Sequence, residues 1–146
     1  MYKRLLVPID GSDTANLALR EAVALAKTHD STLRLLHVVD LMTAYSSVNS
    51  PHIAERENTL VAEGHKVVAD GSEPLMAAGI PFDSKCITTF DKQIYDLIDE
   101  EAKSWPADLI VIGTHGRRGI RRLFLGSVAE GLARISNKPI LLIRGQ

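Results

Sequence analysis

Short runs of apolar, mostly branched residues recur along the chain and alternate with segments of helical periodicity. Four of these runs are rich in Leu, Ile and Val and cover residues 5–9, 33–39, 109–112 and 140–143, and a weaker fifth covers residues 82–88. Uninterrupted apolar runs of about four to eight residues are typical of strands that are buried on both faces. We therefore expect five short strands, of which the four apolar ones at residues 5–9, 33–39, 109–112 and 140–143 are buried on both faces.

The segments between these runs carry apolar stripes with the spacing of an α-helix. One helix would begin at Ser12 or Asp13, either of which suits an N-cap, and another would end before Asn137. Between residues 43 and 79 we expect a helix that breaks or kinks at residues 71–74, with Ser72 capping a short second piece. The three clear stripes are Ala15, Ala18, Leu19, Ala22, Leu25 and Ala26; Ile94, Leu97, Ile98 and Ala102; and Val128, Leu132 and Ile135.

The alternation of strands and helices predicts the topology of the sheet. Parallel neighbours need a crossover connection, usually a helix, so the order β-α-β-α-β-α-β-α-β implies an α/β fold with a largely parallel sheet and helices on both faces. The length of 146 residues, without an internal repeat or a linker, favours a single domain over residues 1–146.

The composition excludes several classes of protein. With 45% hydrophobic and 24% charged residues the chain is an ordinary globular one, and its net charge of −1 gives no general attraction to nucleic acid or anionic membranes. Cys86 is the only cysteine, which excludes an internal disulfide and favours a buried, inert thiol in a cytoplasmic protein. No apolar stretch approaches the roughly 20 residues of a membrane helix, so we expect a soluble protein.

A glycine-rich segment connects the fourth strand to the last helix. Gly113 follows the strand, Gly116 lies two residues further on, and Gly126 and Ser127 precede the helix. Glycines let a backbone approach phosphate oxygens closely and adopt a positive φ. The N-terminus of a helix presents unpaired N–H groups that favour an anion. The segment therefore predicts a phosphate site at the start of the last helix.

This spacing resembles the nucleotide-binding signature of the universal stress protein family, in its ATP-binding branch. Residues 7–12, 36–40 and 136–143 are similar to other blocks of that family in the same order, so the resemblance extends over nearly the whole chain. It implies a Rossmann-like fold, similar to that of the adenine nucleotide alpha hydrolases, with five parallel strands in the order 3-2-1-4-5. It also implies that ATP, with Mg²⁺, is the cofactor.

The resemblance assigns roles to individual residues. Asp10 would hold the ribose and adenine end through its carboxylate, and Val38 mainly through its backbone, while Ser127 would contact a phosphate and could also touch Mg²⁺. His115 and Arg117 could equally contact the nucleotide or face solvent. The implied cofactor-binding residues are Pro8, Asp10, Val38, Ile112, Gly113, His115, Gly116, Arg117, Gly126, Ser127 and Val128.

The resemblance further implies a regulatory protein that acts as a nucleotide-dependent dimeric switch on an unknown protein partner. The last strand would lie at a sheet edge, and an apolar edge strand is a liability unless it is paired. We expect a homodimer in which this strand pairs with its symmetry mate. The residues involved would be Ile140, Leu141, Leu142 and Ile143.

Other functions remain as alternatives. A slow ATPase or phosphotransferase is disfavoured because the chain lacks the Gly-x-x-x-x-Gly-Lys-Ser/Thr motif. A separate alternative is that the protein binds AMP or cyclic AMP in place of ATP. A phosphoacceptor receiver domain is excluded because the third strand does not end in Asp; Asp91 comes later and suits the N-cap of the next helix. The four arginines at 117, 118, 121 and 122 lack interleaved aromatic residues, so we expect no nucleic-acid binding.

Overall fold

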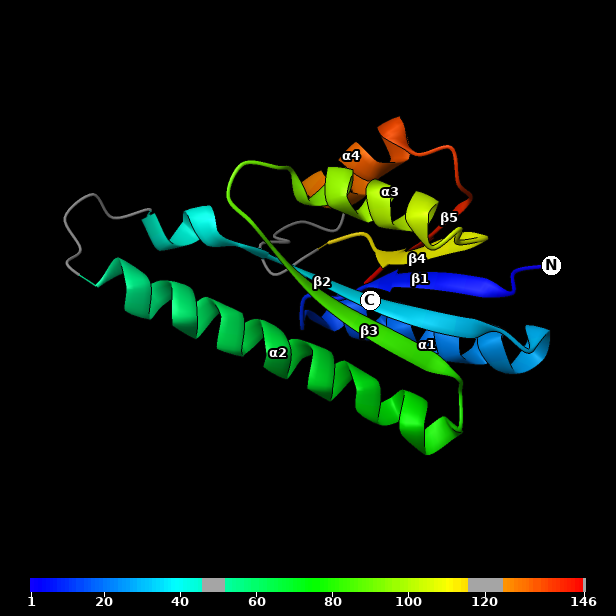
Figure 1. The fold of residues 1–146 in the computed structure, drawn as a ribbon. Coiled ribbons are helices and arrows are strands. Elements are labelled where there is room, and N and C mark those ends of the chain that lie inside the picture. The colour runs from blue at the N-terminus through cyan, green and yellow to red at the C-terminus, as the bar shows by residue number, and fades with distance from the viewer. Residues whose placement is uncertain (46–51, 116–124, 146) are drawn as a thin grey trace.

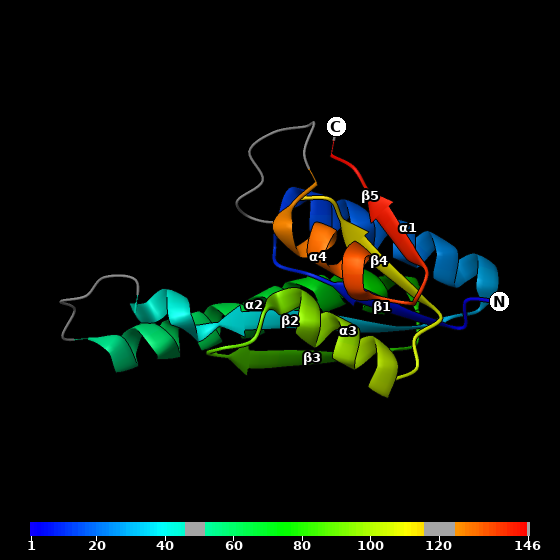
Figure 2. The same cartoon turned by 90° about the horizontal axis from the view of Figure 1, so that it is seen from above.

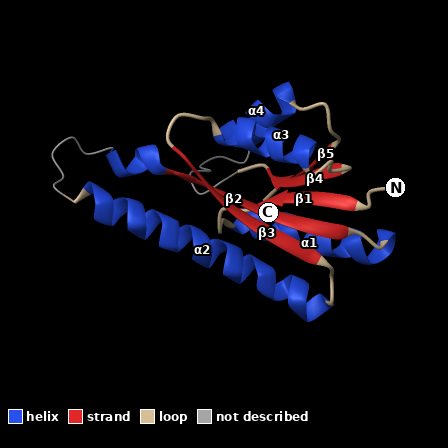
Figure 3. Ribbon diagram, in the orientation of Figure 1, coloured by secondary structure: helices blue, strands red, loops and turns tan. Residues whose placement is uncertain are grey.

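The fold was obtained as a computed structural model, and it describes residues 1–45, 52–115 and 125–145. Five parallel strands form one sheet in the order β3-β2-β1-β4-β5, as predicted. Figure 1 shows the sheet running through the middle of the molecule, and Figure 3 separates its strands from the helices. The strands are β1 (Arg4–Pro8), β2 (Thr32–Asp40), β3 (Phe82–Thr89), β4 (Leu109–Gly113) and β5 (Ile140–Ile143).

Helices cover both faces of this sheet. The first two α-helices lie on one face and the last two on the other, which the two perpendicular views show clearly (Figures 1 and 2). A short 3₁₀ helix follows β2 and extends beyond the strand ends. The helices are α1 (Asp13–His29), the 3₁₀ helix η1 (Leu41–Tyr45), α2 (Ile53–Ala78), α3 (Ile94–Ser104) and α4 (Ser127–Ile135).

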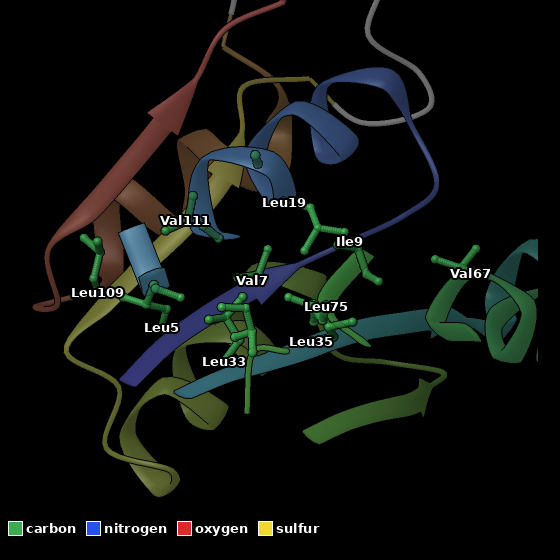
Figure 4. Packing of buried hydrophobic residues seen from close by; sticks show 14 residues of the cluster. Leu5, Val7, Ile9, Leu19, Leu33, Leu35, Val67, Leu75, Leu109 and Val111 are labelled. Atoms are coloured by element: carbon green, nitrogen blue, oxygen red, sulfur yellow. The ribbon is translucent and has the colours of Figure 1, made fainter. Parts of the chain in front are cut away.

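The apolar core is divided by the sheet into two layers because successive side chains of a strand point to opposite faces. Leu5, Val7 and Leu35 pack against α1 and α2, as the close-up in Figure 4 shows. Leu6 and Ile110 pack on the opposite face against α3 and α4. This two-sided burial explains why the runs that form β1, β2 and β4 are apolar without alternation.

The prediction of a break within the second helix is wrong. α2 is continuous over 26 residues although it contains Pro74, and Ser72 donates to the carbonyl oxygen of Val68 one turn earlier instead of capping a new piece. A Cβ on Gly71 would lie 2.7 Å from Cδ1 of Ile9, and one on Gly64 would lie 2.6 Å from Cγ2 of Val39. These glycines allow α2 to lie close to the sheet, and this packing compensates for the cost of a proline within a helix.

The helix starts agree with the predicted caps in one case and differ in another. Ser12 is the N-cap of α1, and its Oγ accepts a hydrogen bond from the amide of Ala15 at 3.3 Å. Asp91 does not cap α3, whose N-cap is Gln93. The reason is a local turn in which Thr89 Oγ1 accepts the amide of Lys92 at 3.1 Å, which delays the start of the helix.

Cys86 lies on β3 beneath α2 and is half-buried, whereas we predicted a buried thiol. Its Sγ would be 3.1 Å from a Cβ on Gly64, so it packs against the helix backbone at this point. Burial raises the pKa of the Cys86 thiol. The thiol therefore stays protonated near neutral pH, which disfavours nucleophilic reactivity.

An ion-pair network connects β2, β3 and α3. The guanidinium of Arg34 makes two hydrogen bonds to the carboxylate of Asp83, at 2.7 and 2.6 Å, and a third to Glu101 Oε1 at 2.6 Å. The other oxygen of Glu101 accepts from Lys85 Nζ at 3.0 Å, and the guanidinium lies 4.7 Å from the ring centroid of Trp105. Asp83 and then Glu101 raise the pKa of Arg34. The side chain of Glu101 is only 6% exposed, so this carboxylate is a buried charge held by two cations.

Candidate functional site

A cavity of about 720 Å³ lies along the carboxyl ends of β1, β2 and β4. Its volume is within the usual range for small-molecule sites. The chain leaves β1 toward α1 on one face of the sheet and leaves β4 toward α4 on the other, so the adjacent ends of β1 and β4 form a topological switch point. In open α/β sheets, ligands bind in the crevice at this point.

The turn after β1 places a carboxylate in the cavity lining. Asp10 is half-buried, and its Oδ1 accepts a hydrogen bond from the amide of Ser12 at 2.9 Å. Gly11 between them has a φ of 80°, a backbone conformation that residues other than glycine rarely adopt. The turn therefore fixes Asp10 next to the start of α1.

The end of β4 packs tightly against α1. A Cβ on Gly113 would lie 2.8 Å from both the backbone carbonyl carbon and Oγ1 of Thr14, so only glycine fits at this contact. The Thr14 hydroxyl also donates to the carbonyl oxygen of His115. Thr14 thus positions the first residues after β4. No pattern in the sequence identifies it, because its partners are about a hundred residues away.

The first turn of α4 closes the cavity beside β4. Gly126 is the N-cap, has no side chain to cap the helix, and donates its amide to the carbonyl oxygen of Thr114 at 2.6 Å. Ser127, Val128 and Ala129 line the cavity. Because the first N–H groups of a helix have no partner within it, this turn offers donors to an anion.

The predicted reason for two of the glycines needs correction. We predicted that they let the backbone approach phosphate oxygens and adopt a positive φ. The second part is wrong, because Gly126 has a φ of −62° and Gly113 is absent from the described glycines with positive φ, which are Gly11 and Gly79. A Cβ on Gly126 would instead lie 2.8 Å from the carbonyl oxygen of Thr114. Both glycines allow segments of the protein to approach each other closely at the site.

His115 offers a buried nitrogen at the cavity wall. Its Nδ1 lies 3.0 Å from Thr114 Oγ1, whereas its Nε2 is buried and has no hydrogen-bond partner among residues 1–45, 52–115 and 125–145. A buried polar atom without a partner is unfavourable, so a ligand that supplies the missing hydrogen bond would gain affinity.

The remaining predicted residues fall into two groups. Pro8, Val38 and Ile112 line the cavity with Asp10, Gly113, His115, Gly126, Ser127 and Val128, so the structure brings these nine predicted residues together. Gly116 and Arg117 lie outside the described residues. His37 also lines the cavity, but its Nδ1 lies 2.7 Å from the carbonyl oxygen of Ile9, so this nitrogen already has a hydrogen-bond partner within the protein.

The part of the cavity beside β2 and β3 contains residues that sequence reasoning missed. Met42 from η1, Leu60 from α2 and Phe90 from the segment after β3 line it. They come from connections and from a helix start, where the sequence has no strong periodicity. They give this end of the cavity an apolar wall.

The site fits a nucleotide better than a bare metal ion. Within the described part of the chain no group of three or more His, Cys, Asp or Glu residues could hold a metal. Mg²⁺ usually binds through phosphate oxygens and water with few protein ligands, so the Ser127 hydroxyl at the start of α4 would suit a magnesium ion that arrives with a polyphosphate.

Comparison with known proteins places the chain among related sequences. A sequence model described as the Universal stress protein family matches residues 1–144. Universal stress protein YxiE of Bacillus subtilis is 30% identical over 151 aligned positions, which cover 99% of this chain and 100% of the relative. The solved structure of MJ0577, a universal stress protein of Methanocaldococcus jannaschii, has a TM-score of 0.87 and 27% identity, and the match covers 100% of this chain and 98% of that one.

More distant solved structures share the fold and contain ligands. A universal stress protein in complex with cAMP is 23% identical with a TM-score of 0.73, and one from Archaeoglobus fulgidus in complex with dAMP is 21% identical with the same TM-score. An Arabidopsis thaliana family member with AMP bound is 18% identical with a TM-score of 0.71. At these identities the likeness establishes the fold alone.

Proposed function

Because the chain belongs to the universal stress protein family, we propose that its cleft binds an adenine nucleotide, ATP in particular, and that the protein is a nucleotide-dependent regulatory switch in the stress response. The observation that carries this proposal is the position of Asp10, Gly113 and the first turn of α4 around one cavity at the switch point of the sheet. The distant relatives with bound cAMP, dAMP and AMP support the choice of an adenine nucleotide.

The lining of the cavity suggests how the nucleotide would be held. The free N–H groups at the start of α4 would donate hydrogen bonds to the phosphate oxygens, with the Ser127 hydroxyl as a further donor. The Asp10 carboxylate would accept hydrogen bonds from ribose hydroxyls, and the base would lie against Val38 and Ile112. When bound, ATP supplies the charge and the binding energy of the switch. It shifts the protein between two conformations only by its difference in affinity for them.

Calorimetric titration of the purified protein with ATP, AMP and cyclic AMP, and with GTP as a control, tests this proposal. We expect saturable binding of ATP with a 1:1 ratio per chain and weaker binding of the other nucleotides. Identification of the nucleotide released on denaturation adds a test that needs no added ligand. A protein that purifies without nucleotide and gives no heat with any adenine nucleotide would contradict the proposal.

Asp10→Asn is expected to weaken ATP binding by about 10- to 150-fold, because one charge-assisted hydrogen bond contributes about 1.5–3 kcal/mol. Asparagine keeps the Oδ1 that accepts from the amide of Ser12, so the turn is preserved. Asp13→Asn is the matched control, since Asp13 is exposed in the first turn of α1 and is absent from the cavity lining. Equal ATP affinities for the two variants would show that Asp10 does not contact the nucleotide.

We also propose that the switch is a homodimer formed through β5. Among the described residues this strand pairs only with β4, at one edge of the sheet, and all four of its residues are half-buried in the single chain. Pairing with a symmetry mate would satisfy the open edge and cover these side chains. Sedimentation at micromolar concentration should give a mass about twice 16.0 kDa. A species at the monomer mass alone would rule out this assembly.

We further propose that the protein is cytoplasmic and that residues 1–146 form one domain. Its single cysteine suits a reducing compartment. In the described part of the chain, no helix has the length and apolar character to cross a membrane.

A further inference from the structure

Large apolar side chains gather in the open at one end of the cavity. Met42 is 51% exposed, Tyr45 41% and Phe90 49%, and the rings of Tyr45 and Phe90 meet edge to face with their centroids 6.2 Å apart. Met42 and Phe90 also line the cavity. We call these three residues the aromatic rim. Clusters of exposed apolar residues mark interaction sites, and Met and aromatic side chains are enriched there.

Hydrogen bonds hold the η1 part of the rim in place. Tyr45 Oη donates to Glu57 Oε1 on α2 at 2.5 Å, and Arg56 donates to the carbonyl oxygen of Ala44 at 3.3 Å. At the other end of η1, Asp40 accepts from the amide of Met42 at 3.0 Å. The hydrogen bond to Glu57 raises the pKa of the Tyr45 phenol, so the phenol remains a donor. An exposed apolar cluster fixed in this way is prepared for a partner, because little ordering remains to be done on binding.

The charges around the rim are mainly negative. Asp40 and Glu57 bond directly to rim residues, Asp91 is next to Phe90 in the chain, and Glu63 lines the cavity together with Asp40 and Asp91. Of the nearby cations, Lys92 lies 3.2 Å from Glu100. Arg56 is bonded to the backbone of η1 as described above. An apolar surface with an acidic border fits a segment that is apolar and basic, and it repels anionic membranes and nucleic acid.

We infer that the aromatic rim is a docking surface for a protein segment that presents an apolar side chain flanked by Lys or Arg. The segment would cover Tyr45 and Phe90, with its cations toward Glu57 and Asp91. Because Met42 and Phe90 belong to the rim and also line the cavity, docking responds to what the cavity holds. This last step rests on the proposed nucleotide binding, whereas docking itself does not.

Selection of a phage-displayed random peptide library on the full-length, nucleotide-free protein tests the inference. We expect enriched peptides that combine an aromatic or aliphatic residue with Lys or Arg. The enriched peptide, synthesised with a fluorescent label, should bind wild type at least tenfold more tightly than Tyr45→Ser, and its affinity should fall as salt is raised. The matched control is Met76→Ser, which removes a 63% exposed apolar side chain at the far end of α2 and should bind like wild type.

Several results would overturn the inference: no enriched peptide, enriched peptides without basic residues, or equal affinity for the Tyr45 and Met76 variants. A change in the sedimentation mass of Tyr45→Ser would instead assign the rim to a second copy of this chain, and binding of vesicles containing anionic lipid would assign it to a membrane. Titration of the peptide with and without ATP separates the two proposals. If ATP binds but leaves peptide affinity unchanged, the coupling is wrong, and if ATP does not bind, the proposed function fails while docking stands.

Discussion

Gly126→Val is expected to weaken ATP binding by about two to four orders of magnitude while the protein stays folded, since two charge-assisted hydrogen bonds contribute about 1.5–3 kcal/mol each. A Cβ on Gly126 would lie 2.8 Å from the carbonyl oxygen of Thr114 and 3.3 Å from Cα of His115. Both contacts are with backbone, which cannot rotate away. Valine would therefore push the first turn of α4 away from the end of β4 and displace the N–H groups that we assign to the phosphates.

The fold should tolerate this change because the φ of −62° and ψ of 156° at Gly126 are accessible to valine. Gly126→Ala should give a smaller loss, since a single methyl group needs a smaller shift. Leu125→Val is the matched control, because Leu125 is the preceding residue, is 36% exposed and is absent from the cavity lining. Calorimetric titration measures the affinities, and circular dichroism checks the fold. Wild-type affinity in a folded Gly126→Val protein would show that the phosphates bind elsewhere.

Glu101→Ala is expected to lower the free energy of unfolding by about 3–5 kcal/mol, the usual cost of breaking a buried ion pair by removing one partner. Glu101 is the common partner of Arg34 and Lys85, and the side chain of Arg34 is only 16% exposed. Without the carboxylate, the guanidinium keeps Asp83 but loses the partner at 2.6 Å on its inner side. The loss should appear in urea unfolding as a lower midpoint with an unchanged slope.

Glu100→Ala provides the matched control for this variant. Glu100 is the preceding residue on the same helix, and its carboxylate lies 3.2 Å from Lys92 Nζ, but both side chains are more than half exposed. Exposed ion pairs contribute about 0–1 kcal/mol. A similar, small loss for both variants would show that the network of Arg34, Lys85 and Glu101 contributes no more than a surface ion pair.

The sequence predicts most of the elements because their signals are local. The runs at residues 5–9 and 140–143 become β1 and β5 with little or no change of boundary, and Ser12 caps α1 as its position suggests. The continuity of α2 could not be predicted in this way. Gly71 looks like a helix breaker until its contact with Ile9, on a different element, is known. The strand order was available only through the family resemblance, because no local pattern encodes which strands are neighbours.

In the candidate site, too, the residues with local sequence signals were predictable and those that depend on packing between distant elements were not. Asp10 and Gly113 follow directly after strands, and parallel strands bring their carboxyl ends to one edge, so their proximity is predictable. Thr14 was missed because its role depends on the close packing of α1 against β4. Of the two reasons predicted for glycine at 126, the positive φ is wrong, whereas the close approach of a phosphate to the backbone stays a prediction; the structure adds a third reason, the contact with Thr114.

The location of the nucleotide is the central claim, and amide chemical shifts during titration of the isotope-labelled protein with ATP test it most directly. We expect saturable changes at Gly113 and at Ser127, Val128 and Ala129, with the amide of Asp10 also affected. Thr32 should be unaffected, because it is the first residue of β2 and lies at the amino ends of the strands, opposite the cavity. Saturable changes centred on the amino ends of the strands, with the start of α4 unmoved, would contradict the account.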